Sequence, residues 1–142
     1  MSTPDAGILN IDKPRGITSH DVVNVIRRIT GIRKVGHAGT LDPMATGVLL
    51  LCIGRATRLA EYLTSSTKGY LATVRLGIET NTYDADGEVV ETRPVTITHE
   101  QVETALDSFR GSIVQVPPMY SALKRQGQPL YKLARQGITV ER

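Results

Sequence analysis

GHAGTLDPMATG, residues 36–47, leads directly into VLLLCI, residues 48–53. The glycines of the first segment permit tight backbone turns, and the uninterrupted apolar run predicts a buried strand. One carboxylate, that of Asp42, stands between Leu41 and Pro43 within the turn-forming segment. The pattern therefore predicts a loop that presents a single acid at the mouth of a buried strand, which makes this loop a candidate functional site.

The residues before this stretch predict a second strand and a helix. Residues 7–12 alternate between apolar and polar side chains over most of their length, as in a strand. A helix over 19–30 is expected next, with Thr18 or Ser19 as its N-cap and Gly31 as its terminating residue. The apolar residues that recur on one face of this helix are Val22, Val23, Ile26 and Ile29.

The residues after the apolar run continue the alternation of helices and strands. We expect a short helix at 56–63, a half-buried strand at 69–76, a hairpin turn at 86–87 before a strand at 88–91, and a helix that starts at a capping box of Thr98 and Gln101 and runs through 109. The predicted fold class is α+β, with a mixed, mainly antiparallel sheet and flanking helices.

The composition changes from residue 111 onward. A turn is expected at 125–128 and a short helix after Pro129. No acidic residue occurs between 111 and Glu141. Four basic residues lie close together in this segment: Lys124, Arg125, Lys132 and Arg135. A solvated basic face and contact with phosphate groups both account for such a cluster, and the residues alone leave the two interpretations open.

Composition limits the class of protein. The 142 residues suffice for one domain, and the net charge of +3 permits a polyanionic partner without requiring one. No apolar run is long enough for a membrane span, and the first residues lack the pattern of a signal peptide, so we expect a cytoplasmic protein. The single cysteine, Cys52, is flanked by apolar residues and is expected in the core.

Several chemistries lack their sequence signatures. The glycine-containing loop does not end in the Gly-Lys-Ser/Thr of a P-loop, and no Gly-x-Gly-x-x-Gly follows the first strand. Ser19, His20 and Asp21 are consecutive on the expected helix, so they point about 100° apart and cannot form a triad. The three histidines share no metal-ligand spacing with one another or with Cys52. We therefore expect neither a metal nor a cofactor.

Four motifs, in order, give the chain a family resemblance. They are ILNIDKP at 8–14, GHAGTLDPMATG at 36–47, KGY at 68–70 with RLG at 75–77, and PMYSALK at 118–124. In order and spacing they resemble the TruB-type pseudouridine synthases, and the resemblance extends from Gly7 to Arg142. It implies an enzyme that isomerises the uridine at position 55, in the T stem-loop of tRNA, to pseudouridine without cofactor or metal.

The resemblance also implies roles for individual residues. Asp42 corresponds to the catalytic carboxylate, which either adds to the sugar C1′ or removes a proton from C2′. Tyr70 corresponds to the tyrosine that stacks on the flipped-out uracil, and His37 to the histidine that enters the space the bases leave. Residues of the matching motifs that we expect to support the site structurally are Lys13, Pro14, Gly39 and Thr40. Without the family, an N-cap before Pro43 at the first helical position is the alternative role for Asp42.

The resemblance further implies a domain organisation. Residues 1–110 correspond to the first half of the catalytic domain, and residues 111–142 to a thumb-like segment that contacts RNA. The family continues with further strands, with an arginine-bearing segment that pairs with the catalytic aspartate, and with a C-terminal RNA-binding domain. We expect the 142 residues alone to be an incomplete and poor enzyme, with the remaining portion as a partner.

Two other functions stay open. A non-catalytic RNA-binding or RNA-chaperone module would use the same basic segment and Tyr70 but would not need the carboxylate of Asp42. A nucleoside hydrolase would need a second carboxylate across the scissile bond, for which Asp84 and Asp86 are the candidates.

Overall fold

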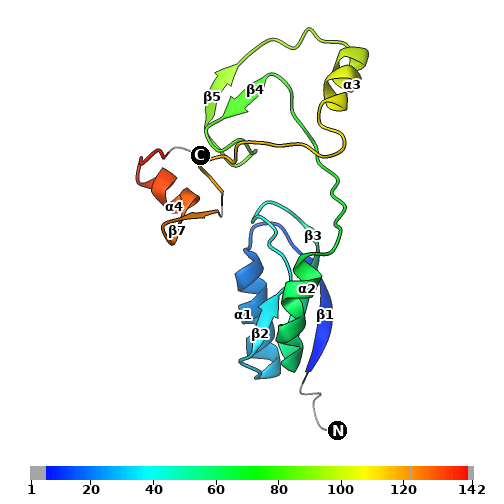
Figure 1. Cartoon of the computed structure of the whole chain (residues 1–142), viewed down its shortest axis with the longest axis vertical. Coiled ribbons are helices and arrows are strands. Elements are labelled where there is room, and N and C mark those ends of the chain that lie inside the picture. Colours follow the sequence, from blue (N-terminus) through cyan, green and yellow to red (C-terminus); the bar gives the residue numbers. More distant parts are fainter. Residues whose placement is uncertain (1–5, 122, 141–142) are drawn as a thin grey trace. The chain divides into compact units, whose positions relative to one another are not determined.

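The computed structural model describes residues 6–121 and 123–140. The chain forms two compact units, an N-terminal unit of residues 1–71 and a C-terminal unit of residues 72–142 (Figure 1). This division at residue 71 was not anticipated from the sequence. Across the described residues, no helix has both the length and the apolar character that a membrane crossing requires.

The N-terminal unit is built on a three-stranded antiparallel sheet. Its strands are β1 (Ala6–Lys13), β2 (Val35–His37) and β3 (Gly47–Gly54), in the order β1-β3-β2. The register places Lys13 opposite Gly47 and His37 opposite Leu51. The end of β1 and the start of β3 therefore meet beside the loop that contains Asp42. The strands predicted at 7–12 and in the apolar run are confirmed, whereas β2 was not predicted because three residues are too few to show a period.

The core lies between the central strand and helix α1 (Ser19–Thr30) (Figure 1). Leu49, Leu51 and Ile53 of β3 pack with Val22, Val23 and Val35 in one buried cluster. Burial of each such side chain contributes on the order of 1.5–3 kcal/mol to stability. Cys52 is fully buried, as expected, and burial raises the pKa of its thiol.

Helix α1 begins and ends where the sequence predicts. The Thr18 hydroxyl accepts a hydrogen bond from the Asp21 amide while the Asp21 carboxylate accepts one from the Thr18 amide, which forms a complete capping box. Gly31 ends the helix at φ 72°, a left-handed conformation that glycine adopts without strain. Ile29 is 72% exposed, because the core cluster extends along the helix only as far as Ile26.

The segment after β3 differs in part from the prediction. A 3₁₀ helix, η1 (Arg55–Leu59), and a short helix, α2 (Ala60–Thr64), occupy the expected helical region. The strand expected at 69–76 is wrong: residues 67–75 have no regular structure, and Leu71 is completely exposed. A strand requires a hydrogen-bonded partner, and no described strand pairs with this segment.

The C-terminal unit consists of small elements. They are β4 (Ile78–Thr80), β5 (Val89–Thr92), α3 (His99–Asp107), β6 (Lys124–Arg125), β7 (Gln128–Pro129) and α4 (Leu130–Arg135). The hairpin turn before β5, the capping box of Thr98 and Gln101, the turn between β6 and β7 and the helix after Pro129 are as predicted. Every strand pair in the described residues is antiparallel, and helices flank the sheet, so the α+β class is confirmed.

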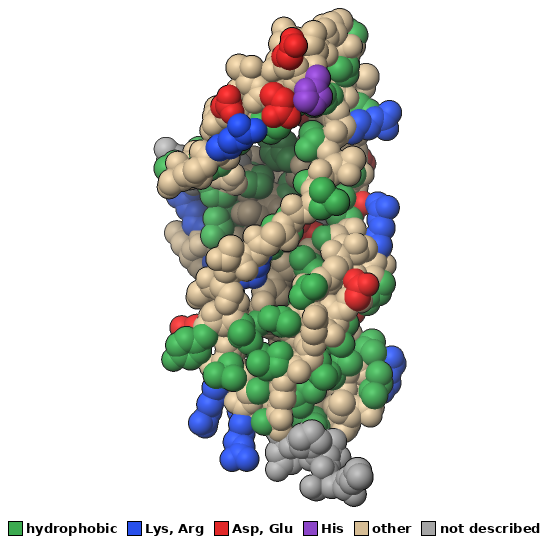
Figure 2. Space-filling view, turned by 90° about the vertical axis from the view of Figure 1, so that its right-hand side faces the viewer, with side chains coloured by type: hydrophobic (Ala, Val, Ile, Leu, Met, Phe, Trp, Pro, Cys, Tyr) green, Lys and Arg blue, Asp and Glu red, His purple; other side chains and the backbone are tan. Residues whose placement is uncertain are grey.

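The two units differ in how much apolar surface they bury. Among the described residues, every buried hydrophobic side chain except that of Leu130 belongs to the N-terminal unit. Hydrophobic side chains reach the surface in both units, and Figure 2 shows them on the face that it draws. The buried core of the described residues therefore lies almost entirely in the N-terminal unit, to which the candidate site is attached.

Candidate active site in the loop after β2

The loop of residues 38–46 connects β2 to β3 and holds Asp42 at its centre. The Ala38 amide donates to the Leu50 carbonyl at 2.8 Å, and the half-buried Leu41 side chain packs against the core cluster. Asp42 itself is exposed. Its carbonyl accepts a hydrogen bond from the Ala45 amide at 3.0 Å, so residues 42–45 form a turn and no helix begins here. Asp42 is therefore not a helix N-cap.

Lys13 holds the residue that follows Asp42. Its side chain is completely buried, and its ammonium group donates hydrogen bonds to the carbonyls of Ile17 at 2.8 Å, Pro14 at 3.1 Å and Pro43 at 3.3 Å. Three acceptors match the three donors of an ammonium group, which offsets the cost of burying its charge. The Pro43 carbonyl also accepts from the Gly16 amide at 2.7 Å. Two donors thus hold the carbonyl of Pro43, the residue that follows Asp42.

Ser19 holds the residue that precedes Asp42. Its hydroxyl donates to the Leu41 carbonyl at 3.1 Å and accepts from the Leu41 amide at 2.9 Å, and the residue is 2% exposed. Sequence reasoning considered Ser19 as a cap and as a member of an excluded triad, and it missed this contact. One signal was present: Thr18 already caps the helix, which leaves the Ser19 hydroxyl for another partner.

The carboxylate of Asp42 is available for chemistry. Within residues 6–121 and 123–140 it has no hydrogen-bond or ion-pair partner, although both neighbouring residues are held by buried groups. The backbone of the acid is thus fixed on two sides while its side chain faces solvent. This arrangement suits a group that acts on a bound molecule.

His37 ends β2 next to this loop and is half-buried. Its Nδ1 atom is buried and has no hydrogen-bond partner in the described part of the chain. A buried ring nitrogen without a partner costs free energy, which distinguishes His37 from an ordinary loop histidine bonded to the backbone.

Tyr70 is 72% exposed in the irregular segment after α2. Lys68, two residues earlier, donates to the carbonyls of Thr64 at 2.6 Å and Ser66 at 2.9 Å. A Cβ built on Gly39, whose φ is 121°, would lie 3.5 Å from Cε of Lys68, so this segment passes beside the Asp42 loop. No hydrogen bond joins Tyr70 to Asp42 in the residues described.

The remaining predicted residues are distributed over both units. Pro14 and Thr40 are exposed in the N-terminal unit. Lys124, Arg125 and Lys132 are exposed in the C-terminal unit, where Arg135 ends α4. The structure thus places Lys13, His37, Gly39 and Asp42 in or beside the β2–β3 loop at one end of the sheet, whereas the four basic residues belong to another unit.

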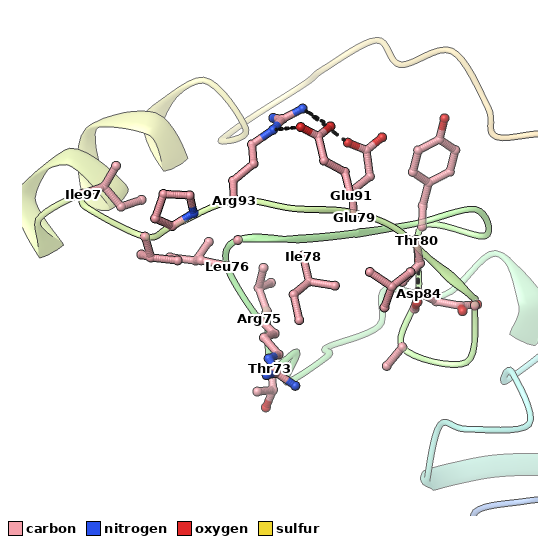
Figure 3. A pocket seen from close by; sticks show the side chains of 18 of the residues that line it. Thr73, Arg75, Leu76, Ile78, Glu79, Thr80, Asp84, Glu91, Arg93 and Ile97 are labelled. Carbon is pink, nitrogen blue, oxygen red and sulfur yellow. Dashed lines mark hydrogen bonds and ion pairs between the residues drawn. The ribbon is translucent and has the colours of Figure 1, made fainter.

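A hollow of about 830 Å³ lies on the β4–β5 hairpin. In Figure 3, Arg93 and its ion-pair partners Glu91 and Glu79 lie on one side of the hairpin, and Leu76 and Ile78 lie on the other. Asp84, a candidate second carboxylate, also lines it. Its Oδ1 accepts from the Thr82 hydroxyl at 2.7 Å and from the Asp86 amide at 3.0 Å, so it organises its own loop.

Comparisons with known proteins show the family of this chain. The family described as "TruB family pseudouridylate synthase (N terminal domain)" matches residues 27–142. The chain belongs to this family. It is 56% identical over 137 residues to "tRNA pseudouridine synthase B" of Stutzerimonas stutzeri strain A1501, a match that covers 96% of this chain and 45% of the relative. The enzyme of the same name from Clostridium kluyveri is 57% identical over 136 residues, which cover 96% of this chain and 47% of the relative.

A solved structure shows the same fold for this TruB-family chain. The "Crystal Structure of a Cbf5-Nop10-Gar1 Complex" contains a chain that matches with a TM-score of 0.57 and 30% identity, over 84% of this chain and 31% of that one. The partial pseudouridine synthase fold inferred from the sequence is therefore confirmed. The chain spans just under half the length of the curated relatives that it matches.

Proposed function

We propose that this chain carries the catalytic carboxylate of an enzyme that isomerises uridine 55, in the T loop of tRNA, to pseudouridine in the cytoplasm. Family membership and the name of its relatives support the tRNA substrate. The observation that carries the proposal is the carboxylate of Asp42, which is solvent-exposed and unpaired among the described residues while its flanking residues are fixed.

The reaction requires few groups. The bond between N1 and C1′ breaks, the base turns, and a bond between C5 and C1′ forms, while N1 gains a proton and C5 loses one. No water, oxidant or nucleotide is consumed. One ionised carboxylate therefore suffices, either by adding to C1′ or by removing a proton from C2′, and Asp42 has the exposure that both routes need.

The target base must leave its stack before Asp42 reaches the ribose. Base flipping costs a few kcal/mol, and stacking on an aromatic ring returns about 1–3 kcal/mol. Tyr70 presents an exposed ring for this purpose. His37, at the end of β2 beside the Asp42 loop, supplies the side chain that enters the vacated space.

The basic residues of the C-terminal unit supply phosphate contacts in this proposal. Lys124 and Arg125 are both exposed on β6, and Lys132 is exposed on α4. Each contact between a lysine and a phosphate group makes RNA affinity fall more steeply as the salt concentration increases. Residues 111–142 then act as the RNA-contacting thumb, and Lys13, Pro14, Gly39 and Thr40 support the site.

The nucleoside-hydrolase alternative is less well supported. Such an enzyme needs a second free carboxylate, and the Asp84 carboxylate is engaged by Thr82 and Asp86 within its own loop. A non-catalytic RNA-binding module remains the alternative that an experiment must separate.

The test uses this chain joined to the C-terminal part of the Stutzerimonas stutzeri relative, with a T-arm stem-loop as substrate. We expect digestion of the treated RNA to nucleosides to yield one pseudouridine per molecule and no free uracil. Bound RNA with only uridine would indicate the non-catalytic module, and released uracil would indicate a hydrolase. The 142 residues alone should convert the RNA poorly.

A further inference from the structure

We propose that Ser19 is a positioning residue for Asp42, an inference that rests on the proposed function. Among the described residues, the Ser19 hydroxyl forms no hydrogen bond with the Asp42 carboxylate, and Ser19 is 2% exposed. Its hydroxyl forms two hydrogen bonds with one residue, donating to the Leu41 carbonyl at 3.1 Å and accepting from the Leu41 amide at 2.9 Å. Both polar backbone groups of the residue before Asp42 are therefore held by a single side chain.

Ser19 is a rigid point of attachment. It is the first residue of α1, and the capping box of Thr18 and Asp21 fixes the start of this helix without using the Ser19 hydroxyl. Val22 and Val23, in the next turn, are buried in the core cluster. A hydroxyl fixed to the core in this way restrains Leu41 over a separation of 22 residues.

The other side of Asp42 is restrained independently. The Pro43 carbonyl accepts from the Lys13 ammonium at 3.3 Å and from the Gly16 amide at 2.7 Å. With both flanking residues held, the acid keeps only the freedom of its own side chain. Catalysis depends on such restraint, because a misplacement of about 1 Å costs on the order of 100-fold in rate.

Two other roles for Ser19 fit the structure less well. A helix cap is already provided by Thr18, whose hydroxyl accepts from the Asp21 amide at 3.0 Å. A nucleophile must be accessible, but Ser19 is 2% exposed and its hydroxyl is engaged both as donor and as acceptor. Positioning is the role that uses both hydrogen bonds.

The experiment measures Ser19→Ala in the joined enzyme defined above. When the enzyme is in saturating excess over RNA, the single-turnover rate constant does not depend on the fraction of enzyme molecules that are folded. We expect this constant to fall by about 10–100-fold while RNA affinity stays within roughly twofold. We also expect the Leu41 amide to exchange with solvent faster, as measured by NMR. Ser65→Ala is the matched control, because in the described part of the chain the exposed Ser65 hydroxyl bonds the Glu61 carbonyl alone, at 3.2 Å.

A second variant distinguishes a loss of positioning from a folding defect. Ser19→Cys keeps the size of the side chain but bonds more weakly, so its rate should lie between those of the wild type and Ser19→Ala. Wild-type rates in both variants, or a loss of rate with unchanged exchange at Leu41, would overturn the inference. An Asp42→Asn enzyme that remains active would instead overturn the proposed function, so the two failures are distinguishable.

Discussion

Lys13 is the residue whose buried charge holds the backbone beside Asp42. Its ammonium group bonds three carbonyls, including that of Pro43. Lys13→Met leaves these acceptors without their charged donor, and we expect a loss of about 2–4 kcal/mol in the free energy of unfolding, measured with urea. Lys34→Met is the control, because Lys34 is exposed. A change in Lys13→Met no larger than that of the control would contradict this account of the loop.

The sequence predicted individual residues unevenly. Asp42 and Lys13 stand in motifs that a family resemblance identifies, and the burial of Cys52 follows from its apolar neighbours. The contact between Ser19 and Leu41 spans 22 residues. No local period or capping rule reports such a contact, because it exists only once α1 packs on the sheet.

At the scale of elements, the start of α1 responds to pH. The hydrogen bonds from the Thr18 hydroxyl and amide lower the pKa of the Asp21 carboxyl, because they favour its ionised form. The Asp21 carboxyl group therefore binds a proton more readily in the unfolded chain than in the folded protein. The contribution of Asp21 to stability is therefore fully present above the ordinary pKa of an aspartate and is lost as the pH falls through the lower pKa of the folded state.

An NMR titration of Asp21 checks this prediction. In Thr18→Ala the hydroxyl is gone but the amide remains, so the pKa of Asp21 should rise toward its ordinary value without reaching it. The same variant should destabilise the protein by about 1 kcal/mol through the lost cap. Identical pKa values in the two proteins would show that the capping box does not form in solution.

The β4–β5 hairpin depends on Gly77. A Cβ at Gly77 would lie 2.5 Å from the Arg93 carbonyl oxygen and 2.7 Å from a Val95 methyl, at φ 79°. Gly111 has nearly the same φ, 77°, and open space around it, so Gly111→Ala isolates the cost of backbone strain. The Arg93 amide donates to the Gly77 carbonyl at 2.8 Å. We expect Gly77→Ala, but not Gly111→Ala, to speed hydrogen exchange of this amide with solvent. Equal protection of this amide in both variants would contradict the packing described for the hairpin.

Local signals predicted the elements that carry them. An N-cap at Thr18 or Ser19 predicted the start of α1, a capping box predicted the start of α3, and an uninterrupted apolar run predicted β3. The strand expected at 69–76 was wrong because alternation reports a preference for extended backbone, not the presence of a pairing partner.

At the scale of the whole molecule, the two units should differ in local stability. Nearly all buried hydrophobic side chains of the described residues lie in the N-terminal unit, and Leu49, Leu51 and Cys52 of β3 are almost inaccessible. We expect the amides of β3 to exchange slowest in the protein and those of β4 and β5 much faster. Slower exchange in the hairpin than in β3 would contradict this assignment of the rigid core. The predicted thumb at 111–142 remains a prediction, since the compact units divide at residue 71.

Our proposal depends on catalysis by the Asp42 carboxylate, which acts on a flipped-out uridine. Tritium release from a T-arm stem-loop labelled at C5 of the target uridine measures this step directly in the joined enzyme. Asp42→Asn should lower the single-turnover rate between about 10²- and 10⁴-fold while RNA affinity is retained. The control Asp12→Asn, at an exposed acid near the end of β1, should release tritium at the wild-type rate. Tritium release by Asp42→Asn at the wild-type rate would show that the Asp42 carboxylate is not the catalytic group.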